Sequence, residues 1–455
     1  MGAAAGMIAT RPGVLIKRSY TPERKKFIEY WKDENNRLKC RGENLVLAFT
    51  KEVQPKPDSS IYDFGAGTGR GGLALALMSG CKVTMVDIAP NCLDKEVSEA
   101  CKNQGDRLSF LEHDMFNALP IRLKYGYAIN FFNNVSDEDL QAVLKNTLNA
   151  VEKLYFTVPC TPERPFEWWV SLLNAYDIIV YLANEDDGEA TFYTSSWMDA
   201  EELLKIGRIN IENEELRNNI RTNIKRGFDQ CKPYNRQERE VILLAGGASL
   251  ADFEEEIKEK RAEGMALITT NGSYKWALDH GMTPSAQIIV DGREFNKKFL
   301  DPIIPECKYM LASQCHPSLF DDMPKDQTLI WHATIDNEMA EVLSENYENV
   351  WFQVLGGSTV ILRGIILLRM LGYYKFHIYG FDSCLLNGKH HSYEQSENNE
   401  DQLASVSLGD QTFLCTTWMV CQAQEFITQV NFMGDEFYLA VYGNGLIANI
   451  LSAAK

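Results

Sequence analysis

The chain has 455 residues and a mass of 51.6 kDa, which exceeds the size at which one hydrophobic core usually stops growing. Hydrophobic residues make up 45% of it, enough to fill two cores. The formal net charge of −18 and the pI near 5.0 give no overall electrostatic basis for non-specific nucleic-acid binding. Small, phosphorylated substrates are therefore favoured over duplex DNA.

Cysteine usage and the apolar segments indicate the environment of the chain. The eleven cysteines, spread from Cys40 to Cys421, contain no Cys-x-x-Cys pair, which favours reduced thiols in the cytoplasm over a disulfide framework or a metal site. The first residues lack an apolar run long enough for a signal peptide. The most apolar later segment, Val354 to Tyr374, is interrupted by two arginines and does not suit a bilayer. We therefore expect a soluble cytoplasmic protein with no membrane contact and no structural metal.

The chain begins with a segment, residues 1–19, that has the composition of a flexible tail. A polar helical pattern with aromatic residues follows from Thr21 to Phe49, and we expect it to cap the next domain. A linker with prolines and serines, Lys51 to Ser60, ends this region. The apolar run Ile61 to Phe64 then predicts the first buried strand.

The glycines after this strand predict a ligand-binding loop at the start of a helix, because backbone N–H groups there bind phosphate or carboxylate. Gly65, Gly67 and Gly69 form a Gly-x-Gly-x-Gly pattern, and the helical pattern continues from Leu73. This spacing alone permits NAD, FAD or S-adenosylmethionine. Asp63, two residues before the first glycine, favours a ligand with an ammonium group, because a carboxylate is unfavourable beside a pyrophosphate.

Two further carboxylates follow the next two predicted strands. The run Cys81 to Val86 ends at Asp87. Its separation from the glycines along the sequence is typical of a carboxylate that accepts hydrogen bonds from both ribose hydroxyls. The run Leu108 to Leu111 ends near Asp114. Acidic residues therefore stand at three successive strand ends.

This series resembles the class I S-adenosylmethionine-dependent methyltransferases over about residues 20 to 200. The resemblance implies that Asp63 lies near the methionine amine, Asp87 binds the ribose and Asp114 faces the adenine. It also implies that the three glycines let the backbone approach the cofactor. The pattern continues through a strand at Tyr127 to Phe132, a helix from Ser136 whose capping partner is Asp139, and a strand at Tyr155 to Val158.

Amides follow the fourth strand of this series, where relatives often carry an acid or a histidine. We assign Asn130 to the cofactor pocket and Asn134 to the acceptor, because an amide orients a hydroxyl or amine but is a poor general base. The chain has no Asn-Pro-Pro-Tyr motif, so methylation of DNA bases on nitrogen is unsupported. Cys160 follows the fifth strand and not the fourth, which favours a structural thiol over a nucleophile. Two tryptophans on the helix of residues 167–176 suit core packing better than an acceptor pocket.

The second half repeats the alternation of strands and helices after a polar helical stretch, residues 201–232, and a charged turn region. Strands are predicted at Val241 to Ala245, Ala266 to Thr270 and Gln287 to Val290, with helices between them, and a strand pair at Phe432 to Tyr442. The expected fold class is α/β: two doubly wound, mostly parallel Rossmann-like domains joined by a helical linker. We place the first domain at residues 20–205, the linker at 206–236 and the second domain at 237–455.

The second half resembles the MptE-like family over about residues 215 to 455. The motifs are AGGASL, TTNGSYKWALDHGMTPSAQIIVD, GGSTV and YGFDSCLLNGKHH. The family includes archaeal 6-hydroxymethyl-7,8-dihydropterin diphosphokinase and flagellar motility accessory factors that glycosylate flagellin. A proline usual in the first glycine loop is alanine here, at Ala248. The resemblance implies that Asp382 and His391 flank the transferred group and are catalytic. The residues that it implies for nucleotide binding are Gly246, Gly247, Ser249, Asn271, Asp291, Gly356, Gly357 and Ser358.

Together, these patterns predict a bifunctional transferase. One domain would transfer a methyl group from S-adenosylmethionine to a small molecule or glycan. The other would transfer a glycosyl or diphosphoryl group from a nucleotide donor, with Mg²⁺ where the donor is ATP or a nucleotide sugar. The alternatives are a 6-hydroxymethylpterin diphosphokinase-like enzyme with an accessory methyltransferase domain, and a non-catalytic scaffold. The sequence leaves the oligomeric state open, a homo-oligomer included, and the acidic stretch of residues 394–402 predicts an exposed loop.

Overall fold

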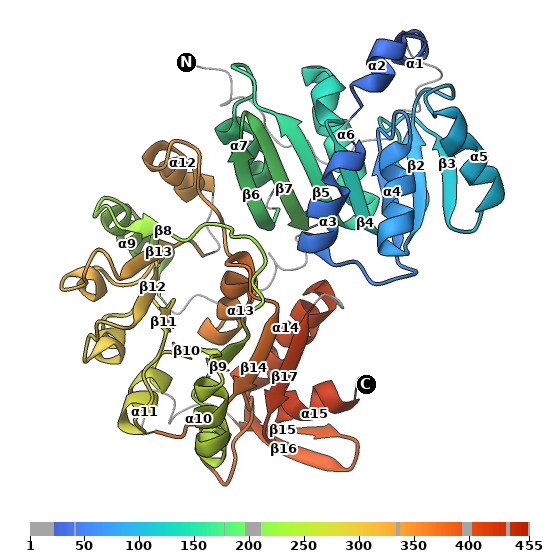
Figure 1. Cartoon of the computed structure of the whole chain (residues 1–455). Helices are drawn as coiled ribbons and strands as arrows, with labels where there is room; N and C mark the ends of the chain where they lie inside the picture. Colours follow the sequence, from blue (N-terminus) through green and yellow to red (C-terminus); the bar gives the residue numbers. More distant parts are fainter. Residues whose placement is uncertain are drawn as a thin grey trace. The chain divides into compact units, whose positions relative to one another are not determined.

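A computed structural model describes residues 22–40, 42–176, 178–195, 211–333, 337–393, 403–433 and 437–453. The predicted tail of residues 1–19 and the acidic loop of residues 394–402 lie outside these ranges, as does the boundary predicted between residues 205 and 206. The chain divides into two compact units, Met1–Thr50 with Pro55–Val158, and Lys51–Gln54 with Pro159–Lys455. Two large sheets organise the described residues (Figure 1). The predicted α/β class is confirmed.

The first sheet has seven strands in the order β3-β2-β1-β4-β5-β7-β6. Strands β1 to β5 pair with their neighbours among these five in parallel, and β6 and β7 form an antiparallel hairpin. The direction in which successive strands are added to the sheet therefore reverses at β1, which has β2 on one side and β4 on the other. The strands are β1 (Ser60–Phe64), β2 (Lys82–Asp87), β3 (Leu108–Glu112), β4 (Leu123–Ile129), β5 (Val151–Pro159), β6 (Val180–Asp186) and β7 (Glu189–Ser195).

The helices of this part begin and end largely where the sequence places them. Helix α4 starts directly after Gly69 and ends at Gly80, and both glycines have left-handed backbone angles. The Ser136 hydroxyl accepts from the Asp139 N–H at the start of α6, as the capping pattern predicts. The helices are α1 (Pro22–Tyr30), α2 (Glu34–Leu38), η1 (Gly42–Leu45), α3 (Val46–Val53), α4 (Arg70–Ser79), α5 (Lys95–Asn103), η2 (Phe132–Asn134), α6 (Asp137–Asn149) and α7 (Phe166–Ala175).

The second sheet has eight strands in the order β17-β14-β9-β10-β11-β12-β13-β8, and its neighbouring strands all pair in parallel. In this sheet the direction of strand addition reverses at β9, which has β10 on one side and β14 on the other. The strands are β8 (Asp229–Gln230), β9 (Val241–Leu244), β10 (Ala266–Thr270), β11 (Ala286–Ile289), β12 (Lys308–Ala312), β13 (Thr328–Trp331), β14 (Lys375–Tyr379) and β17 (Tyr438–Tyr442).

The helices of the second half include one feature that the sequence pattern misassigned. The predicted strand pair at Phe432 to Tyr442 is wrong: α14 continues to Met433, and only β17 follows, parallel to β14. A separate hairpin, β15 (Leu403–Leu408) with β16 (Gln411–Thr416), precedes α14. The helices are α9 (Asn213–Ile224), η3 (Ala248–Phe253), α10 (Glu254–Ala262), α11 (Ser273–Asp279), η4 (Glu294–Leu300), η5 (Pro317–Phe320), α12 (Asn337–Asn346), α13 (Val360–Met370), α14 (Thr417–Met433) and α15 (Leu446–Ala453).

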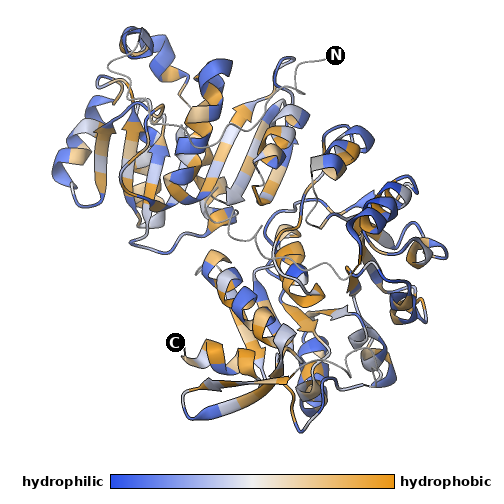
Figure 2. Ribbon diagram, turned by 180° about the vertical axis from the view of Figure 1, so that it is seen from behind, coloured by the Kyte–Doolittle hydropathy of each residue, from blue (hydrophilic) through white to orange (hydrophobic). Residues whose placement is uncertain are grey.

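The apolar residues gather on the strands of both sheets and on the helix faces that cover them (Figure 2). Helix α13, inside the most apolar segment of the sequence, is buried along its whole length. Its Arg363 donates to the Val354 carbonyl at 2.9 Å, and the Arg369 guanidinium lies 3.7 Å from the centre of the Tyr374 ring. Among the described helices, none has both the length and the apolarity that a membrane span requires. Trp169 of α7 is fully buried, as core packing predicts.

Candidate functional site

The first candidate site lies where the direction of strand addition reverses in the first sheet, at the carboxyl ends of β1 and β4. Open α/β sheets bind ligands at this position, because the loops that leave the two strands run in opposite directions and open a crevice. A cavity of about 330 Å³ occupies it. Of the predicted site residues, the cavity is lined by Gly65, Asp87, Asp114, Asn130 and Asn134.

The glycine loop after β1 needs residues without a side chain at two of its positions. Gly65 and Gly67 have φ angles of 65° and 53°, which most residues avoid. A Cβ atom on Gly65 would lie 2.5 Å from the Phe131 ring, and one on Gly67 would lie 2.8 Å from the Trp31 ring. Aromatic side chains therefore pack directly on this loop, and glycine is required for space as well as for conformation.

Asp87 is held at the edge of the cavity by backbone donors. Its Oδ2 accepts from the Gly67 N–H at 3.0 Å, and its Oδ1 accepts from the Ala89 N–H at 2.9 Å. Burial raises the pKa of this carboxyl to about 6, while the N–H groups of Ala89, Gly67 and Ile88 act in the opposite direction. At neutral pH the group is therefore mainly an oriented, ionised hydrogen-bond acceptor.

Asp63 is the more deeply buried of the two carboxylates, at 4% exposure. Burial and the nearby charge of Asp87 raise its pKa to about 8, and the Gly72 N–H acts in the opposite direction. Within the described part of the chain, its Oδ2 is buried and has no hydrogen-bond partner. A cation that reached this position would relieve the repulsion between the two carboxylates.

The remaining predicted residues of this site lie in the loops after β3 and β4. The Asp114 carboxylate accepts from the Phe116 N–H at 3.0 Å, which orients it at the cavity. The Asn134 amide donates to the Asn130 carbonyl at 2.7 Å, and Asn130 has a φ of 52°. The Asn134 side chain therefore stabilises the loop that carries Asn130. The side-chain oxygen of Asn134 takes no part in that hydrogen bond.

The N-terminal segment supplies a wall of the cavity that the sequence predicted only as a cap. Lys26, Phe27 and Trp31 line the cavity from α1 and the turn after it. The sequence signal for this role is the aromatic residues on an otherwise polar helix. Their contact partners lie far away along the chain, so the sequence did not assign them to the site.

The second candidate site lies where the direction of strand addition reverses in the second sheet, at the carboxyl ends of β9 and β14. Asp382 follows β14 and is 3% exposed. Its Oδ1 accepts from the Ser249 hydroxyl at 2.5 Å, and its Oδ2 accepts from the Ser249 N–H at 2.9 Å. Burial raises the pKa of Asp382, and these two bonds act in the opposite direction.

Three glycines close around the Asp382 carboxylate. A Cβ atom on Gly247 would lie 2.4 Å from its Oδ2, and one on Gly445 would lie 2.5 Å from its Cα. Gly443, after β17, lies against both Asp382 and Ser249. The sequence pattern did not predict Gly443 or Gly445 as site residues, because they directly follow the segment in which a strand pair was predicted.

The segment from His391 to Tyr393 covers the same glycine loop. The His391 Nδ1 lies 3.2 Å from the Gly246 carbonyl, which also accepts from the Ser392 N–H at 3.1 Å. A Cβ atom on Gly246 would lie 2.3 Å from the Tyr393 hydroxyl, and one on Gly272 would lie 2.4 Å from the Tyr393 ring. This ring therefore fills the space between Gly246, after β9, and Gly272, after β10.

Other predicted nucleotide contacts already have partners within the chain. Asp291 forms an ion pair with Arg293 in the turn after β11. The Ser358 N–H and hydroxyl both donate to the Glu425 carboxylate, at 2.9 and 2.8 Å. Gly356 and Gly357 have left-handed backbone angles in the turn that leads to Ser358. A phosphate at this turn would have to displace Glu425.

Comparisons with known proteins find two family models in the chain. The family model of a methyltransferase domain matches residues 61–153, and the model described as 6-hydroxymethylpterin diphosphokinase MptE-like matches residues 214–388. The chain combines a methyltransferase domain with an MptE-like domain. The comparison with curated proteins finds no match.

Solved structures similar to the methyltransferase domain include the magnesium protoporphyrin IX methyltransferase of Synechocystis PCC 6803 with bound S-adenosylmethionine. It is 11% identical and has a TM-score of 0.33, over 40% of this chain and 100% of that one. Another is the 1,6-didemethyltoxoflavin-N1-methyltransferase of Burkholderia thailandensis, 14% identical with a TM-score of 0.32, over 40% of this chain and 92% of that one.

A third similar structure extends over most of the chain. The MAf glycosyltransferase of Magnetospirillum magneticum AMB-1 is 12% identical and has a TM-score of 0.42. The match covers 89% of this chain and 60% of the glycosyltransferase.

The residues in and next to the cavity of the methyltransferase domain fit S-adenosylmethionine in their chemistry, with Asp87 in the lining and Asp63 buried on β1. An ammonium group matches the buried Asp63 oxygen that has no partner among the described residues, and ribose hydroxyls match the oriented Asp87 carboxylate. The methyltransferase domain thus supports S-adenosylmethionine as its cofactor.

Proposed function

We propose that the chain is a bifunctional transferase whose methyltransferase domain methylates a small molecule or glycan. The observation that carries this proposal is the cavity at the carboxyl ends of β1 and β4, which Gly65 and Asp87 line. The buried Asp63 on β1 does not line this cavity, but it lies close enough to Asp87 for the charge of Asp87 to raise its pKa. Bound S-adenosylmethionine would supply an electrophilic methyl group. Asp87 would accept from the ribose hydroxyls, and Asp63 would face the methionine ammonium.

In the reaction, the residues of this domain would mainly align the acceptor. Positioning alone lowers the barrier to methyl transfer, because the acceptor is held at attack distance from the methyl carbon. The Asn134 amide is fixed by its bond to the Asn130 carbonyl, which leaves its side-chain oxygen to orient a hydroxyl or amine. An acceptor that is already nucleophilic needs little help from a general base.

A binding experiment and a turnover experiment test this function. S-adenosylhomocysteine should raise the unfolding temperature of the full chain, because it binds only the folded state. NAD at the same concentration serves as the control. A shift with NAD and none with S-adenosylhomocysteine would overturn the cofactor assignment. Acceptor-dependent release of S-adenosylhomocysteine from a panel of glycans and small molecules would then identify the substrate class.

For the MptE-like domain we propose nucleotide-dependent transfer at the carboxyl ends of β9 and β14, where Asp382 is held by Ser249. A buried carboxylate at this position suits contact with an acceptor hydroxyl or with a metal-bound donor. Glycosyl transfer is favoured over diphosphoryl transfer because a pterin rarely needs a linked methylation. The diphosphokinase-like alternative, with an accessory methyltransferase domain, predicts a different donor.

Thermal unfolding with ATP and Mg²⁺, and with CMP-, UDP- and GDP-sugars, separates the two donors. Stabilisation by a nucleotide sugar supports glycosyl transfer, and stabilisation by ATP and Mg²⁺ supports diphosphoryl transfer. Asp382→Asn should remove the second activity and leave methyl transfer unchanged. Retention of full activity by this variant would contradict the catalytic role of Asp382.

A scaffold function is the second candidate, and two observations favour it. Glu425 occupies the Ser358 donors, and the Tyr393 ring fills the space between Gly246 and Gly272. If no nucleotide stabilises the folded chain, the MptE-like domain is a scaffold and the transferase proposal holds for the methyltransferase domain alone.

A further inference from the structure

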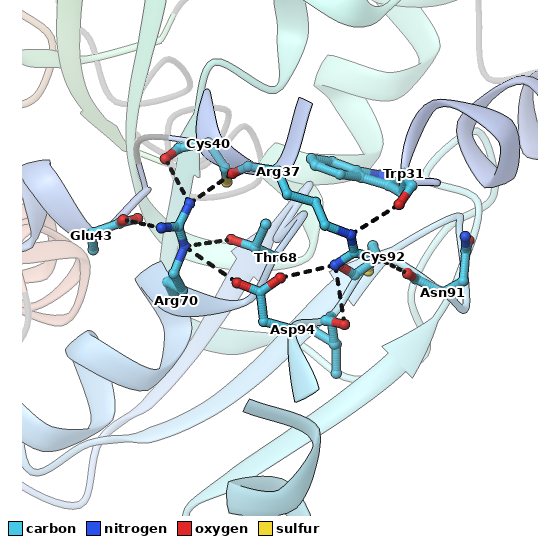
Figure 3. Close-up of polar contacts among 10 residues, drawn as sticks. Trp31, Arg37, Cys40, Glu43, Thr68, Arg70, Asn91, Cys92 and Asp94 are labelled. Carbon is cyan, nitrogen blue, oxygen red and sulfur yellow. Dashed lines mark hydrogen bonds and ion pairs between the residues drawn. The ribbon is translucent and has the colours of Figure 1, made fainter. Parts of the chain in front are cut away.

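Two arginines outside the cavity tie the N-terminal wall of the cofactor site to the loops that follow β1 and β2. The wall consists of residues 22–40 and 42–45, which include α1, α2 and η1 and bring Phe27 and Trp31 to the cavity. Figure 3 shows Arg37 and Arg70 on either side of Asp94, with dashed contacts to both groups of segments. Neither arginine lines the cavity.

Arg37 comes from α2 and binds the loop after β2 almost entirely through backbone carbonyls. Its Nη2 donates to the Asn91 carbonyl at 2.6 Å, and its Nη1 donates to the Cys92 carbonyl at 2.8 Å and to the Asp94 carboxylate at 2.9 Å. Its Nε donates to the Trp31 carbonyl at 3.0 Å. One guanidinium thus holds the turn that carries Trp31 against the loop that begins one residue after Asp87.

Arg70 closes the network from the other side. It is the first residue of α4, directly after the glycine loop, and its Nη2 donates to the Arg37 carbonyl at 2.7 Å. It also pairs with Glu43 at 3.2 Å and with Asp94 at 3.6 Å. The Asp94 carboxylate is therefore shared by the two arginines, one from the wall and one from the start of α4.

The network ends on atoms that would touch the cofactor. The Trp31 ring packs on Gly67, and the Gly67 N–H holds the Asp87 carboxylate. The wall, the glycine loop and the ribose-binding carboxylate therefore form one connected unit. If the wall separated from the two loops, the cavity would open along the side formed by α1.

We propose that Arg37 is a positioning residue for the cofactor, which it retains by clamping the N-terminal wall to the loops after β1 and β2. The inference rests on the proposed function, because it takes S-adenosylmethionine as the ligand of this cavity. Its effect should fall on cofactor dissociation more than on the methyl-transfer step, because Arg37 does not reach the cavity itself. Lysine cannot replace it fully, because an ammonium group cannot bond to four separated acceptors at once.

The test compares Arg37→Ala and Arg37→Lys with the wild-type chain and with Arg107→Ala. Arg107 is a matched control: it also donates to a loop carbonyl, that of Gly80, and pairs with a carboxylate, that of Asp58, but at the other end of the strands. Calorimetry gives the affinity for S-adenosylhomocysteine, and stopped-flow fluorescence gives its dissociation rate. Hydrogen exchange of residues 22–45 reports whether the wall stays closed.

For Arg37→Ala we expect binding at least about tenfold weaker, mostly through faster dissociation, and the KM for S-adenosylmethionine should rise while kcat stays within about twofold. Arg37→Lys should be intermediate, and Arg107→Ala should match the wild type. Hydrogen exchange of the wall should slow on binding in the wild type and less so in the variants.

The proposal is overturned if Arg37→Lys and a folded Arg37→Ala both release S-adenosylhomocysteine at the wild-type rate. It is also overturned if kcat falls with KM unchanged. If Arg37→Ala does not fold, Arg37→Lys and Asp94→Asn decide the question, since each weakens the clamp and keeps most of its packing. Failure of the wild-type chain to bind S-adenosylhomocysteine would instead reject the proposed cofactor, and the clamp proposal with it.

Discussion

The backbone N–H of Gly67 donates to the carboxylate of Asp87 at 3.0 Å, which joins the loop after β1 to the end of β2. The same glycine supports the Trp31 ring on its other side. One residue without a side chain therefore sets the distance between the N-terminal wall and the carboxylate proposed to bind the ribose.

Affinity for S-adenosylhomocysteine should depend on the ionisation of Asp87. Its pKa is raised to about 6 in the ligand-free chain, and only the ionised carboxylate accepts hydrogen bonds from both ribose hydroxyls. Protonation of Asp87 should therefore lower the affinity, by up to about tenfold per pH unit, as the pH falls below 6, in addition to the change that the ionisation of Asp63 causes near pH 8. Calorimetry between pH 5 and pH 8 measures this. Asp87→Asn should bind more weakly and lose this dependence, and an unchanged pH profile in that variant would assign the titration to another group.

Asp63→Asn should separate stability from binding. The folded chain keeps the Asp63 proton up to about pH 8, whereas the unfolded chain loses it near the ordinary value of 3.8. Between these values the folded state binds more protons, so the contribution of Asp63 to stability falls as the pH rises from about 4 to about 8. The ligand-free variant should therefore unfold at a higher temperature than the wild type above pH 8.

The same variant should gain less stability from S-adenosylhomocysteine, because its neutral amide does not attract the ligand's ammonium group. Thermal unfolding at pH 5 and pH 8.5, with and without the ligand, gives both results. A variant that is less stable than the wild type at pH 8.5 and still shows the full ligand shift would contradict the placement of Asp63.

Gly67→Ala should be much more harmful than Gly188→Ala. Both glycines have positive φ angles, of 53° and 74°, so each substitution carries backbone strain of about 1–2 kcal/mol. Only at Gly67 would the new Cβ atom also meet a ring, that of Trp31, at 2.8 Å, since nothing lies within 4 Å of a Cβ atom on Gly188. Chemical unfolding and calorimetry with S-adenosylhomocysteine should show binding lost in Gly67→Ala and kept in Gly188→Ala. Equal effects of the two substitutions would mean that backbone strain, and not the contact with Trp31, causes the damage.

Tyr393→Ala should strengthen nucleotide binding in the MptE-like domain. The Tyr393 ring lies against Gly246 and Gly272, so a nucleotide that bound at these two glycines would have to displace it. Removal of that competition should raise the affinity for the nucleotide that stabilises the wild-type chain, by about tenfold. Tyr234→Ala, at a tyrosine that is 62% exposed, is the control. A loss of nucleotide affinity in Tyr393→Ala would show instead that the ring contacts the ligand.

The sequence by itself determined the two sheets and most of the strand-end residues. Asp63, Asp87 and Asp114 each follow an apolar run that predicts a strand, and in parallel sheets such ends meet at one edge, so local pattern was enough to group them. Ser249 and Asp382 were predicted for the same reason. The pattern failed at Phe432 to Tyr442, because a short apolar run does not distinguish a helix end from a strand.

Only the tertiary structure decided which distant side chains complete each site. Arg37 reaches the loop after β2 across more than fifty residues, Glu425 occupies the Ser358 donors from α14, and Tyr393 fills the space between Gly246 and Gly272. The sequence around these residues has no motif that marks such contacts. Their roles depend on how helices and loops pack on the sheets, and packing brings together residues whose spacing along the chain carries no periodic signal.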